Sequence, residues 1–241
     1  MLAAGTEGKT TMPRLTLATI TAIAGFVAGC AHVPPAAPPS VVPNLFDAQQ
    51  AITQYIDSGR YQADVAAVVT EARAWLEQRA PSVQKPAIVL DIDETALSNW
   101  RAYRVNGWAR ITHGGCDLDH GPCNLRLWQN LGQSEALPAT RQLVDRARQL
   151  GVAVFFVTGR SASGRAATER NLREQGYAFD RVILRPEGTF PSAVAFKAPA
   201  RCAIEREGYR VLLSMGDQQS DLDGGCAERT FKLPNPVYFL P

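Results

Sequence analysis

The run from Ile88 to Thr95 constrains the fold of this chain more than any other part of its sequence. It consists of an apolar stretch that ends in two acids, Asp91 and Asp93. Side chains two positions apart on a strand point to the same face, so both carboxylates are aimed at one point beyond a buried strand. Two converging carboxylates are unfavourable unless a cation or a shared proton neutralises them. The run therefore indicates a metal-assisted site, although aspartates also follow strands in solvated loops and helix caps.

The rest of the chain alternates between strand-like and helix-like segments. Its length of 241 residues fits one domain with a sizeable core. Strands are expected at about 87–92, 152–157, 181–184, 211–214 and 230–233. Two helices should precede the first strand and end near Ala80, and later ones should end near Gly151 and Gly176, the latter capped by Ser163. A last helix should follow Lys197. This alternation predicts an α/β fold with a doubly wound parallel sheet.

One segment, residues 99–137, breaks the alternation. It is rich in glycine, holds two cysteines and carries four large aromatic side chains. An insertion at this place would overhang the ends of the strands, where a cap sits. We expect the cap to comprise this segment together with residues 45–80.

The N-terminus has the pattern of an export signal. Lys9 and Arg14 precede the short apolar run 15–27, which ends in Ala-Gly-Cys30. The stretch 27–30 resembles a bacterial lipoprotein signal, so residues 1–29 are expected to be removed and Cys30 to be lipidated, with Met12 as an alternative start. The proline-rich stretch 30–44 then forms a tether to a domain at 45–241. By resemblance to Gram-negative lipoproteins, Ala31 favours the outer membrane.

The other four cysteines are consistent with export. Cys116, Cys123, Cys202 and Cys226 permit two disulfides in an oxidising compartment, with three possible pairings. We favour Cys116–Cys123, which closes a short loop, and Cys202–Cys226, which joins two late segments. A metal site around Cys116 is the alternative, but its spacing matches no zinc pattern.

Three further polar elements follow strands or begin helices. Thr158-Gly159-Arg160 offers a hydroxyl, an open backbone and a guanidinium, which suit phosphate oxygens. Lys197 can reach a phosphate as a point charge. Asp217 and Asp221 add two more carboxylates after a later strand. Each element alone is also typical of a turn or a solvated surface, but their order at successive strand ends favours one site.

Taken together, these residues resemble the haloacid dehalogenase superfamily of phosphohydrolases, whose order of motifs is Asp-x-Asp-x-Thr, Ser/Thr, Lys/Arg and an acidic pair. The match is closer to the class B and C acid phosphatases, which include bacterial lipoprotein, 5′-nucleotidase-like enzymes and plant vegetative storage proteins. The residues that carry it are the segments 91–99, 136–138, 155–160, 216–222 and 232–236. The likeness spans about 45–241, but the insertion at 99–137 matches no cap that can be aligned, which leaves the substrate open.

The resemblance implies phosphomonoester hydrolysis through an aspartyl-phosphate. Asp91 would be the nucleophile and Asp93 the proton carrier. The metal residues would be Asp91, Asp93 through its backbone carbonyl, Asp217 and Asp221, and a hard cation with oxygen ligands fits Mg²⁺. Thr158, Gly159, Arg160 and Lys197 would bind the phosphoryl group, with Asp221 orienting water or Lys197. Arg160 is the weakest of these, because an arginine there is more often in a surface ion pair.

Other functions are less well supported. The net charge of +2 and the lack of a basic stripe exclude nucleic acid as an expected partner. The aromatic residues Trp100, Tyr103, Trp108 and Trp128 favour cap packing over stacking on a nucleobase, although a nucleoside monophosphate remains a candidate substrate. His113 and His120 are expected on surface loops. A phosphotransferase, a non-catalytic storage or binding lipoprotein, and a homodimer remain open.

Overall fold

The computed structural model describes residues 44–188 and 190–240, which form one compact unit. The predicted signal, the lipidated Cys30 and most of the tether lie outside these residues. Among the described residues, no helix combines the length and the apolar character needed to cross a membrane.

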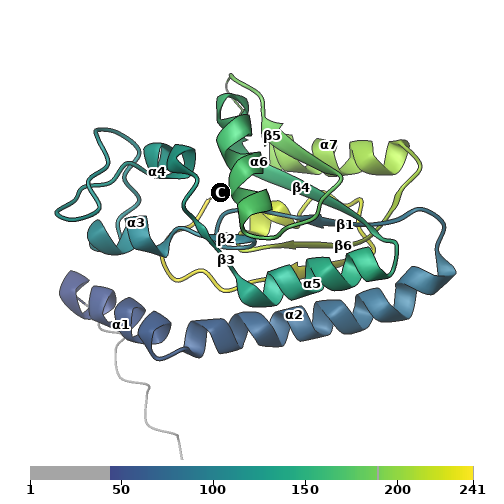
Figure 1. Ribbon diagram of the computed structural model, residues 1–241, viewed down its shortest axis with the longest axis horizontal. Helices are drawn as coiled ribbons and strands as arrows, with labels where there is room; N and C mark the ends of the chain where they lie inside the picture. The colour runs from purple at the N-terminus through teal and green to yellow at the C-terminus, as the bar shows by residue number, and fades with distance from the viewer. Residues whose placement is uncertain (1–43, 189, 241) are drawn as a thin grey trace, which may run out of the picture. The chain divides into compact units, whose positions relative to one another are not determined.

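A five-stranded sheet forms the centre of the molecule (Figure 1). Its order is β5-β4-β1-β6-β7, and every neighbouring pair is parallel. The strands are β1 (Pro86–Leu90), β4 (Ala153–Ser161), β5 (Arg181–Arg185), β6 (Arg210–Gly216) and β7 (Arg229–Lys232). The predicted parallel α/β sheet is therefore confirmed, with β1 at its middle.

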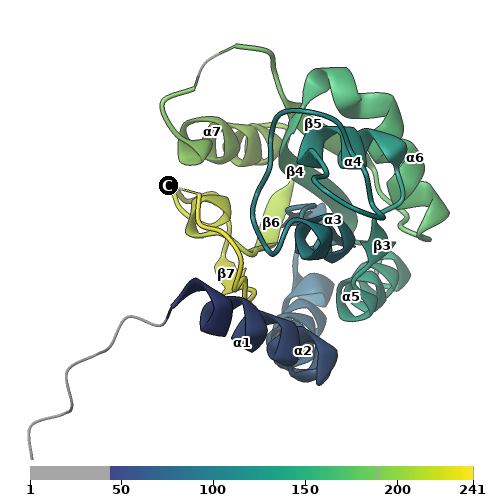
Figure 2. The same ribbon diagram turned by 90° about the vertical axis from the view of Figure 1, so that its left-hand side faces the viewer.

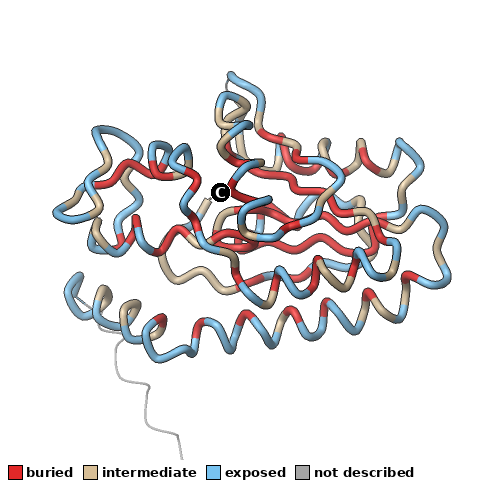
Figure 3. Tube along the Cα trace, viewed as in Figure 1, coloured by how far each residue is buried: buried red, intermediate tan, exposed pale blue. Residues whose placement is uncertain are grey.

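Helices cover both faces of the sheet, because successive side chains of each strand point to opposite sides. On β1, Ile88 and Leu90 pack in the larger core, which also contains residues of α2 (Arg60–Arg79) and α5 (Pro138–Gln149). Ala87 and Val89 pack in the smaller core with Phe196 of α7 (Ala193–Arg206). The sheet is thus buried from both sides, whereas the helices bury only their inner faces (Figure 3).

Two helices precede the sheet, as predicted. Helix α1 (Leu45–Asp57) begins at Asn44, whose side chain accepts a hydrogen bond from the backbone N–H of Asp47. Gly59, with a positive φ of 80°, turns the chain into α2. Helix α2 then runs beneath the sheet beside α5 (Figure 1).

The segment between β1 and α5 projects beyond the carboxyl ends of the strands (Figures 1 and 2). It contains α3 (Trp100–Val105) and α4 (Leu125–Leu131). Two short strands, β2 (Leu97–Ser98) and β3 (Glu135–Ala136), pair antiparallel at its base. The loop between α3 and α4 is closed by the disulfide Cys116–Cys123.

Two helix starts differ from the prediction. Lys197 lies inside α7, which begins four residues earlier because the side chain of Ser192 caps it by accepting from the N–H of Ala195. Ser163 does not cap α6 (Arg165–Glu174), because a 3₁₀ turn at Ala162–Gly164 comes first and the Ser163 hydroxyl contacts Ser161 instead.

Candidate active site

The two aspartates of the first motif leave β1 in different directions. The backbone N–H of Asp91 donates to the carbonyl of Met215 at 2.9 Å, so Asp91 still extends the sheet. The chain then turns tightly around the carbonyl of Ile92, which accepts from the N–H groups of the third to fifth residues after Ile92 at 2.8–3.3 Å. Glu94 adopts a positive φ of 53° in this turn. The turn places Asp91 and Asp93 among different partners.

Asp91 joins a group of three buried carboxylates. One carboxylate oxygen each from Asp91, Asp217 and Asp221 lies within 4.8 Å of the others. Asp217 and Asp221 follow β6, the neighbour of β1, so the parallel sheet brings their side chains to the same edge. The carboxylate of Asp93 does not belong to this group, so any contribution of Asp93 to a metal site is restricted to its backbone carbonyl.

Lys197 provides the positive charge beside these acids. Its Nζ donates to Oδ1 of Asp91 at 2.7 Å and also to Oδ1 of Asp221. The lysine and both aspartates are buried. Of the two roles predicted for Asp221, orienting Lys197 or a water, the structure shows the contact with the lysine.

The electrostatics of the group show that three carboxylates are too many for one lysine. Burial raises the pKa of Asp91 well above its ordinary value, and the negative charges of Asp221 and Asp217 add to this against the opposing effect of Lys197. Burial and the charge of Asp221 raise the pKa of Asp217 to about 6. The pKa of Lys197 is raised because the two carboxylates outweigh its desolvation. The group consists of hard oxygen donors only, so it fits a divalent cation.

The second acidic pair is held by residues around it. The backbone N–H of Gln218 donates to Asp221 at 2.9 Å, and the side-chain amides of Gln218 and Asn235 both donate to Asp217 at 2.6 Å. Gly216 has no room for a side chain, because an added Cβ would overlap the carboxylate of Asp221. Sequence reasoning did not assign Gln218 or Asn235 a role, although both lie in segments that carry the family resemblance.

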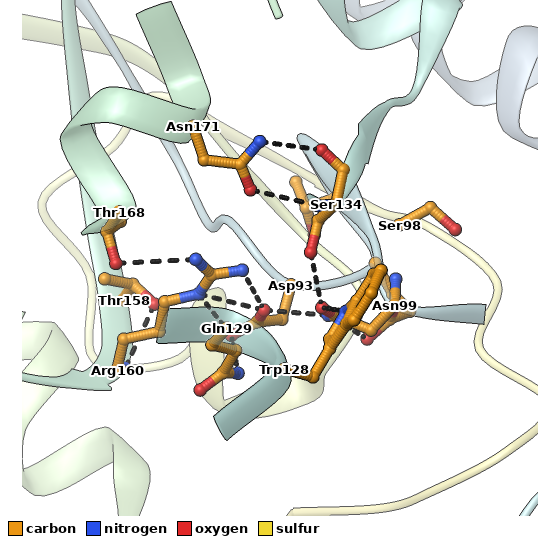
Figure 4. Close-up of polar contacts among 12 residues, drawn as sticks. Asp93, Ser98, Asn99, Trp128, Gln129, Ser134, Thr158, Arg160, Thr168 and Asn171 are labelled. Atoms are coloured by element: carbon orange, nitrogen blue, oxygen red, sulfur yellow. Dashed lines mark hydrogen bonds and ion pairs between the residues drawn. The ribbon is translucent and has the colours of Figure 1, made fainter. Parts of the chain in front are cut away.

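Asp93 is held by a separate set of donors (Figure 4). Arg160 donates from Nη2 to Oδ1 at 2.7 Å and from Nε to both oxygens at 3.0 and 3.2 Å. Asn99 donates to Oδ1 at 2.8 Å and Gln129 of α4 donates to Oδ2 at 3.1 Å. Burial acts to raise the pKa of Asp93, but the charge and hydrogen bonds of Arg160, with the hydrogen bond of Asn99, hold it below its ordinary value.

Asn99 is itself oriented by the insertion. Its Oδ1 accepts from Nε1 of Trp128 and from the hydroxyl of Ser134, both at 3.0 Å, which turns its amide nitrogen toward Asp93. Asn171 of α6 fixes Ser134 through both of its backbone groups, at 2.8 and 3.2 Å (Figure 4). Asp93 is therefore anchored through a chain of contacts that reaches from β1 to α6.

The Thr158-Gly159-Arg160 motif lies at the end of β4, next to β1. Thr158 is buried and its hydroxyl accepts from the N–H of Arg160 at 3.1 Å. Gly159 is exposed and lines the pocket, where an added side chain would meet open space. Arg160 was expected to contact phosphate or to form a surface ion pair, but its side chain is only 2% exposed and pairs with Asp93.

Most of these groups line one pocket of about 140 Å³, although Thr158 and Asp221 do not belong to its lining. Its lining includes the predicted residues Asp91, Asp93, Gly159, Arg160, Lys197 and Asp217. Tyr103 and Tyr238 form an aromatic wall, with ring centres 5.6 Å apart. Tyr238 also donates its hydroxyl to Glu94 at 3.0 Å.

The remaining predicted residues lie away from the acids. Trp100, Trp108 and Trp128 are buried and pack in the core, as expected, and only Tyr103 among the four aromatics lines the pocket. His113 is exposed, and His120 lies in the exposed loop, 3.2 Å from Asp117. The disulfides Cys116–Cys123 and Cys202–Cys226 are both present, in the favoured pairing.

Comparisons with known proteins agree with this geometry. The family model "HAD superfamily, subfamily IIIB (Acid phosphatase)" matches residues 36–241. The stem 28 kDa glycoprotein of Glycine max is 34% identical over 197 residues, which cover 79% of this chain and 74% of that protein. Acid phosphatase 1 of Solanum lycopersicum is 34% identical over 155 residues, which cover 63% of this chain and 58% of that protein. The class C acid phosphatase from Bacillus anthracis has the same fold, with a TM-score of 0.64 at 22% identity, covering 81% of this chain and 86% of that one.

Proposed function

This chain belongs to the subfamily IIIB acid phosphatases of the HAD superfamily and is a phosphomonoesterase, and we propose that Asp91 is its nucleophile and Asp93 its proton carrier. The observation that carries this assignment is the separation of the two acids. Asp91 contacts Lys197 at 2.7 Å in the buried carboxylate group, whereas Asp93 contacts Arg160 at 2.7 Å on the other side. This separation supports Asp91 as the acid that attacks phosphorus and Asp93 as the acid that transfers the proton.

The proposed reaction has two steps. In the first, an oxygen of Asp91 forms a bond to phosphorus while the bond to the ester oxygen breaks, and Asp93 gives its proton to the leaving alcohol. In the second, Asp93 takes a proton from water as the water oxygen attacks phosphorus, which releases inorganic phosphate and restores Asp91. Lys197 and the hydroxyl of Thr158 stabilise the charge on the phosphoryl oxygens.

The first step requires a protonated Asp93, and this supports activity in acid. The protonated fraction of Asp93 rises as the pH falls, and because its pKa is held below its ordinary value, this rise comes at a lower pH than for an ordinary aspartate. The second step uses the deprotonated form that Arg160 and Asn99 stabilise.

The cation is proposed to be Mg²⁺. The donor set of Asp91, Asp217 and Asp221 contains carboxylate oxygens only, with no imidazole or thiolate, which favours a hard cation. The bound cation would supply positive charge to the phosphoryl oxygens. Asn235 and Gln218 hold Asp217 in place for it.

One assay tests the assignment. Residues 31–241 are offered p-nitrophenyl phosphate near pH 5 with Mg²⁺, and again after chelation. We expect turnover by the wild type, loss on chelation, and loss in Asp91→Asn. Unchanged turnover in Asp91→Asn would exclude Asp91 as nucleophile, and unchanged turnover with chelator would exclude the metal. Adding alcohols and measuring transferred phosphate tests the phosphotransferase alternative.

Export and lipidation complete the proposal. The two disulfides support an oxidising compartment, and the sequence at 27–30 supports a lipid on Cys30, with the domain facing the periplasm or the cell surface from the outer membrane. Labelled palmitate should be incorporated into the wild type but not into Cys30→Ser. Equal labelling of both would exclude Cys30.

Nucleoside monophosphates are the proposed substrates, supported by the aromatic wall of Tyr103 and Tyr238, and a panel that includes sugar phosphates tests them.

A further inference from the structure

The pocket contains arginines that the proposed reaction does not use. Arg160 pairs with Asp93, but Arg126 and Arg185 also line the pocket. Within the part of the chain that the structure describes, no carboxylate oxygen lies within 4.0 Å of either guanidinium. Both side chains are therefore available for an anion that enters the pocket.

Arg185 is the less solvated of the two. It is the last residue of β5, paired in register with Ser161 of β4, which also lines the pocket. Its Nε is shielded from solvent and has no hydrogen-bond partner among the described residues. A buried donor without an acceptor costs free energy, which a ligand oxygen would recover.

A carboxylate already occupies the neighbouring donors. Glu187, two residues after β5, accepts from the hydroxyl of Ser161 and from the backbone N–H of Ser163 at 3.3 Å. The hydrogen bonds from Ser161 and Ser163, with a smaller effect of the nearby Arg126 charge, lower the pKa of Glu187. The oxygens of this exposed carboxylate stand where the oxygens of a ligand anion would bind.

We propose that Arg126, Arg185 and Ser161 form a subsite for a second anionic group, so that the preferred substrates are phosphomonoesters that carry another phosphate. The inference rests on the proposed function, because the scissile phosphate must sit on Asp91 and Lys197. The second phosphate displaces Glu187, which is exposed on the loop before α7.

The location of the donors separates this subsite from the scissile phosphate. Arg126 lies in the first turn of α4 and Arg185 ends β5, whereas Lys197 belongs to α7. Ser161 shares β4 with Thr158 but lies three residues further along the strand. Arg126 is exposed and Arg185 half-buried, in contrast to the buried Lys197. A substrate whose scissile phosphate lies on the buried acids would direct its second phosphate toward these more exposed arginines of the same pocket.

The test compares matched substrates. The wild type is assayed with glucose 6-phosphate against glucose 1,6-bisphosphate, and with adenosine 5′-monophosphate against adenosine 3′,5′-bisphosphate. The quantity measured is the ratio of kcat/KM, bisphosphate over monophosphate. We expect a ratio of roughly ten in at least one pair, since a charge-assisted pair discriminates by about this factor. The pair that shows it identifies whether a sugar or a nucleoside carries the second phosphate.

Three variants test whether the proposed subsite determines the ratio of kcat/KM. Arg126→Ala and Arg185→Met should each lower it toward one, and Glu187→Gln should raise it, because the competing charge is removed. Arg206→Ala, which removes an exposed arginine at the end of α7, is the matched control and should leave it unchanged.

The outcomes separate the two proposals. No turnover of any phosphomonoester would mean that the proposed function is wrong. Turnover of monophosphates with a wild-type ratio near one, or a ratio that Arg126→Ala and Arg185→Met leave unchanged, would overturn the subsite alone. A lower ratio in Glu187→Gln would show that Glu187 supports the loop instead of standing in for a ligand.

Discussion

Replacing Asp91 with asparagine should abolish turnover and at the same time stabilise the metal-free protein. Asp91 is fully buried with two other carboxylates and one lysine, and its pKa is raised mainly because burial disfavours its charge. Asparagine keeps the shape of the side chain and removes that charge. The same feature that prepares the site for a cation therefore costs stability when the cation is absent.

The size of the effect follows from the distances. Each repulsion between carboxylates whose oxygens lie within 4.8 Å is worth at least about 3.5 kcal/mol at an effective dielectric constant of about 20, and Asp91 has two such neighbours. The lost attraction to Lys197 at 2.7 Å is worth about 6 kcal/mol on the same scale. The difference favours asparagine by about 1 kcal/mol, and relief from desolvation adds to it. We expect a gain of about 1–3 kcal/mol in the free energy of unfolding.

Urea unfolding at pH 7 measures this gain. With chelator, Asp91→Asn should unfold at a higher urea concentration than the wild type with the same slope. With saturating Mg²⁺ the wild type should gain stability and the variant should gain less, because one ligand is lost. The advantage of the variant in chelator should also shrink as the pH is lowered, since a protonated Asp91 carries no charge to relieve.

Asp119→Asn is the matched control, because it removes an exposed aspartate of the insertion loop. It should change the unfolding free energy by less than about 0.5 kcal/mol in either condition. If Asp91→Asn were less stable than the wild type in chelator, the lysine would already balance the three acids. The group would then need no cation to balance its charge.

Two further substitutions test other parts of the structure. Arg79 and Arg210 hold the pKa of Glu228 at about 2, and this shift from 4.5 corresponds to about 3 kcal/mol. We expect Glu228→Gln to lower the free energy of unfolding by only about 1–2 kcal/mol, because both arginines are partly exposed and solvent screens their charges. Urea titrations should find the full loss above pH 4.5, and the loss should vanish as the pH falls through 2, where Glu228 is protonated. A loss that persists at pH 2 would contradict the link between the charge of Glu228 and stability. Gly216→Ala should reduce kcat at least about 100-fold, because its Cβ overlaps Asp221 and moves it from Lys197. Wild-type activity in Gly216→Ala would mean that the position of Asp221 has no kinetic importance.

The sequence predicted the sheet and the group of acids for the same physical reason. In a parallel sheet, the residue after every strand lies at one edge, so motifs that end strands must meet there. Asp91 after β1 and Asp217 after β6 are 126 positions apart in the chain but belong to adjacent strands. No knowledge of side-chain packing was needed for that inference.

Helix starts were less predictable, because competing local signals decide them. Ser192 caps the start of α7, but Pro199 lies inside the helix, although proline is normally found at the first turn of a helix or beyond its end. The position of Lys197 within the helix therefore did not follow from the pattern. The predicted contact between Lys197 and the acids did not depend on where the helix begins. A helix that begins at Lys197 and one that begins at Ala193 both bring the lysine to the same edge of the sheet.

The role of Arg160 could not be predicted from its neighbours in the chain. Its partner Asp93 is 67 residues away, and the burial of both depends on the turn after β1 and on α4. A guanidinium that follows Thr-Gly suits phosphate equally well. Only the structure shows that this charge is paired with Asp93.

The insertion contributes hydrogen bonds to Asp93 as well as part of the pocket lining. Arg160 comes from the sheet and supplies the charge, whereas Asn99 and Gln129 come from the insertion and supply neutral hydrogen bonds. Neutral donors shift the charge balance less than a guanidinium does, so their larger effect is on where the carboxylate points. Gln129 lies one turn after Arg126 on α4. A substrate anion bound to Arg126 would therefore contact the same helix that donates to Asp93.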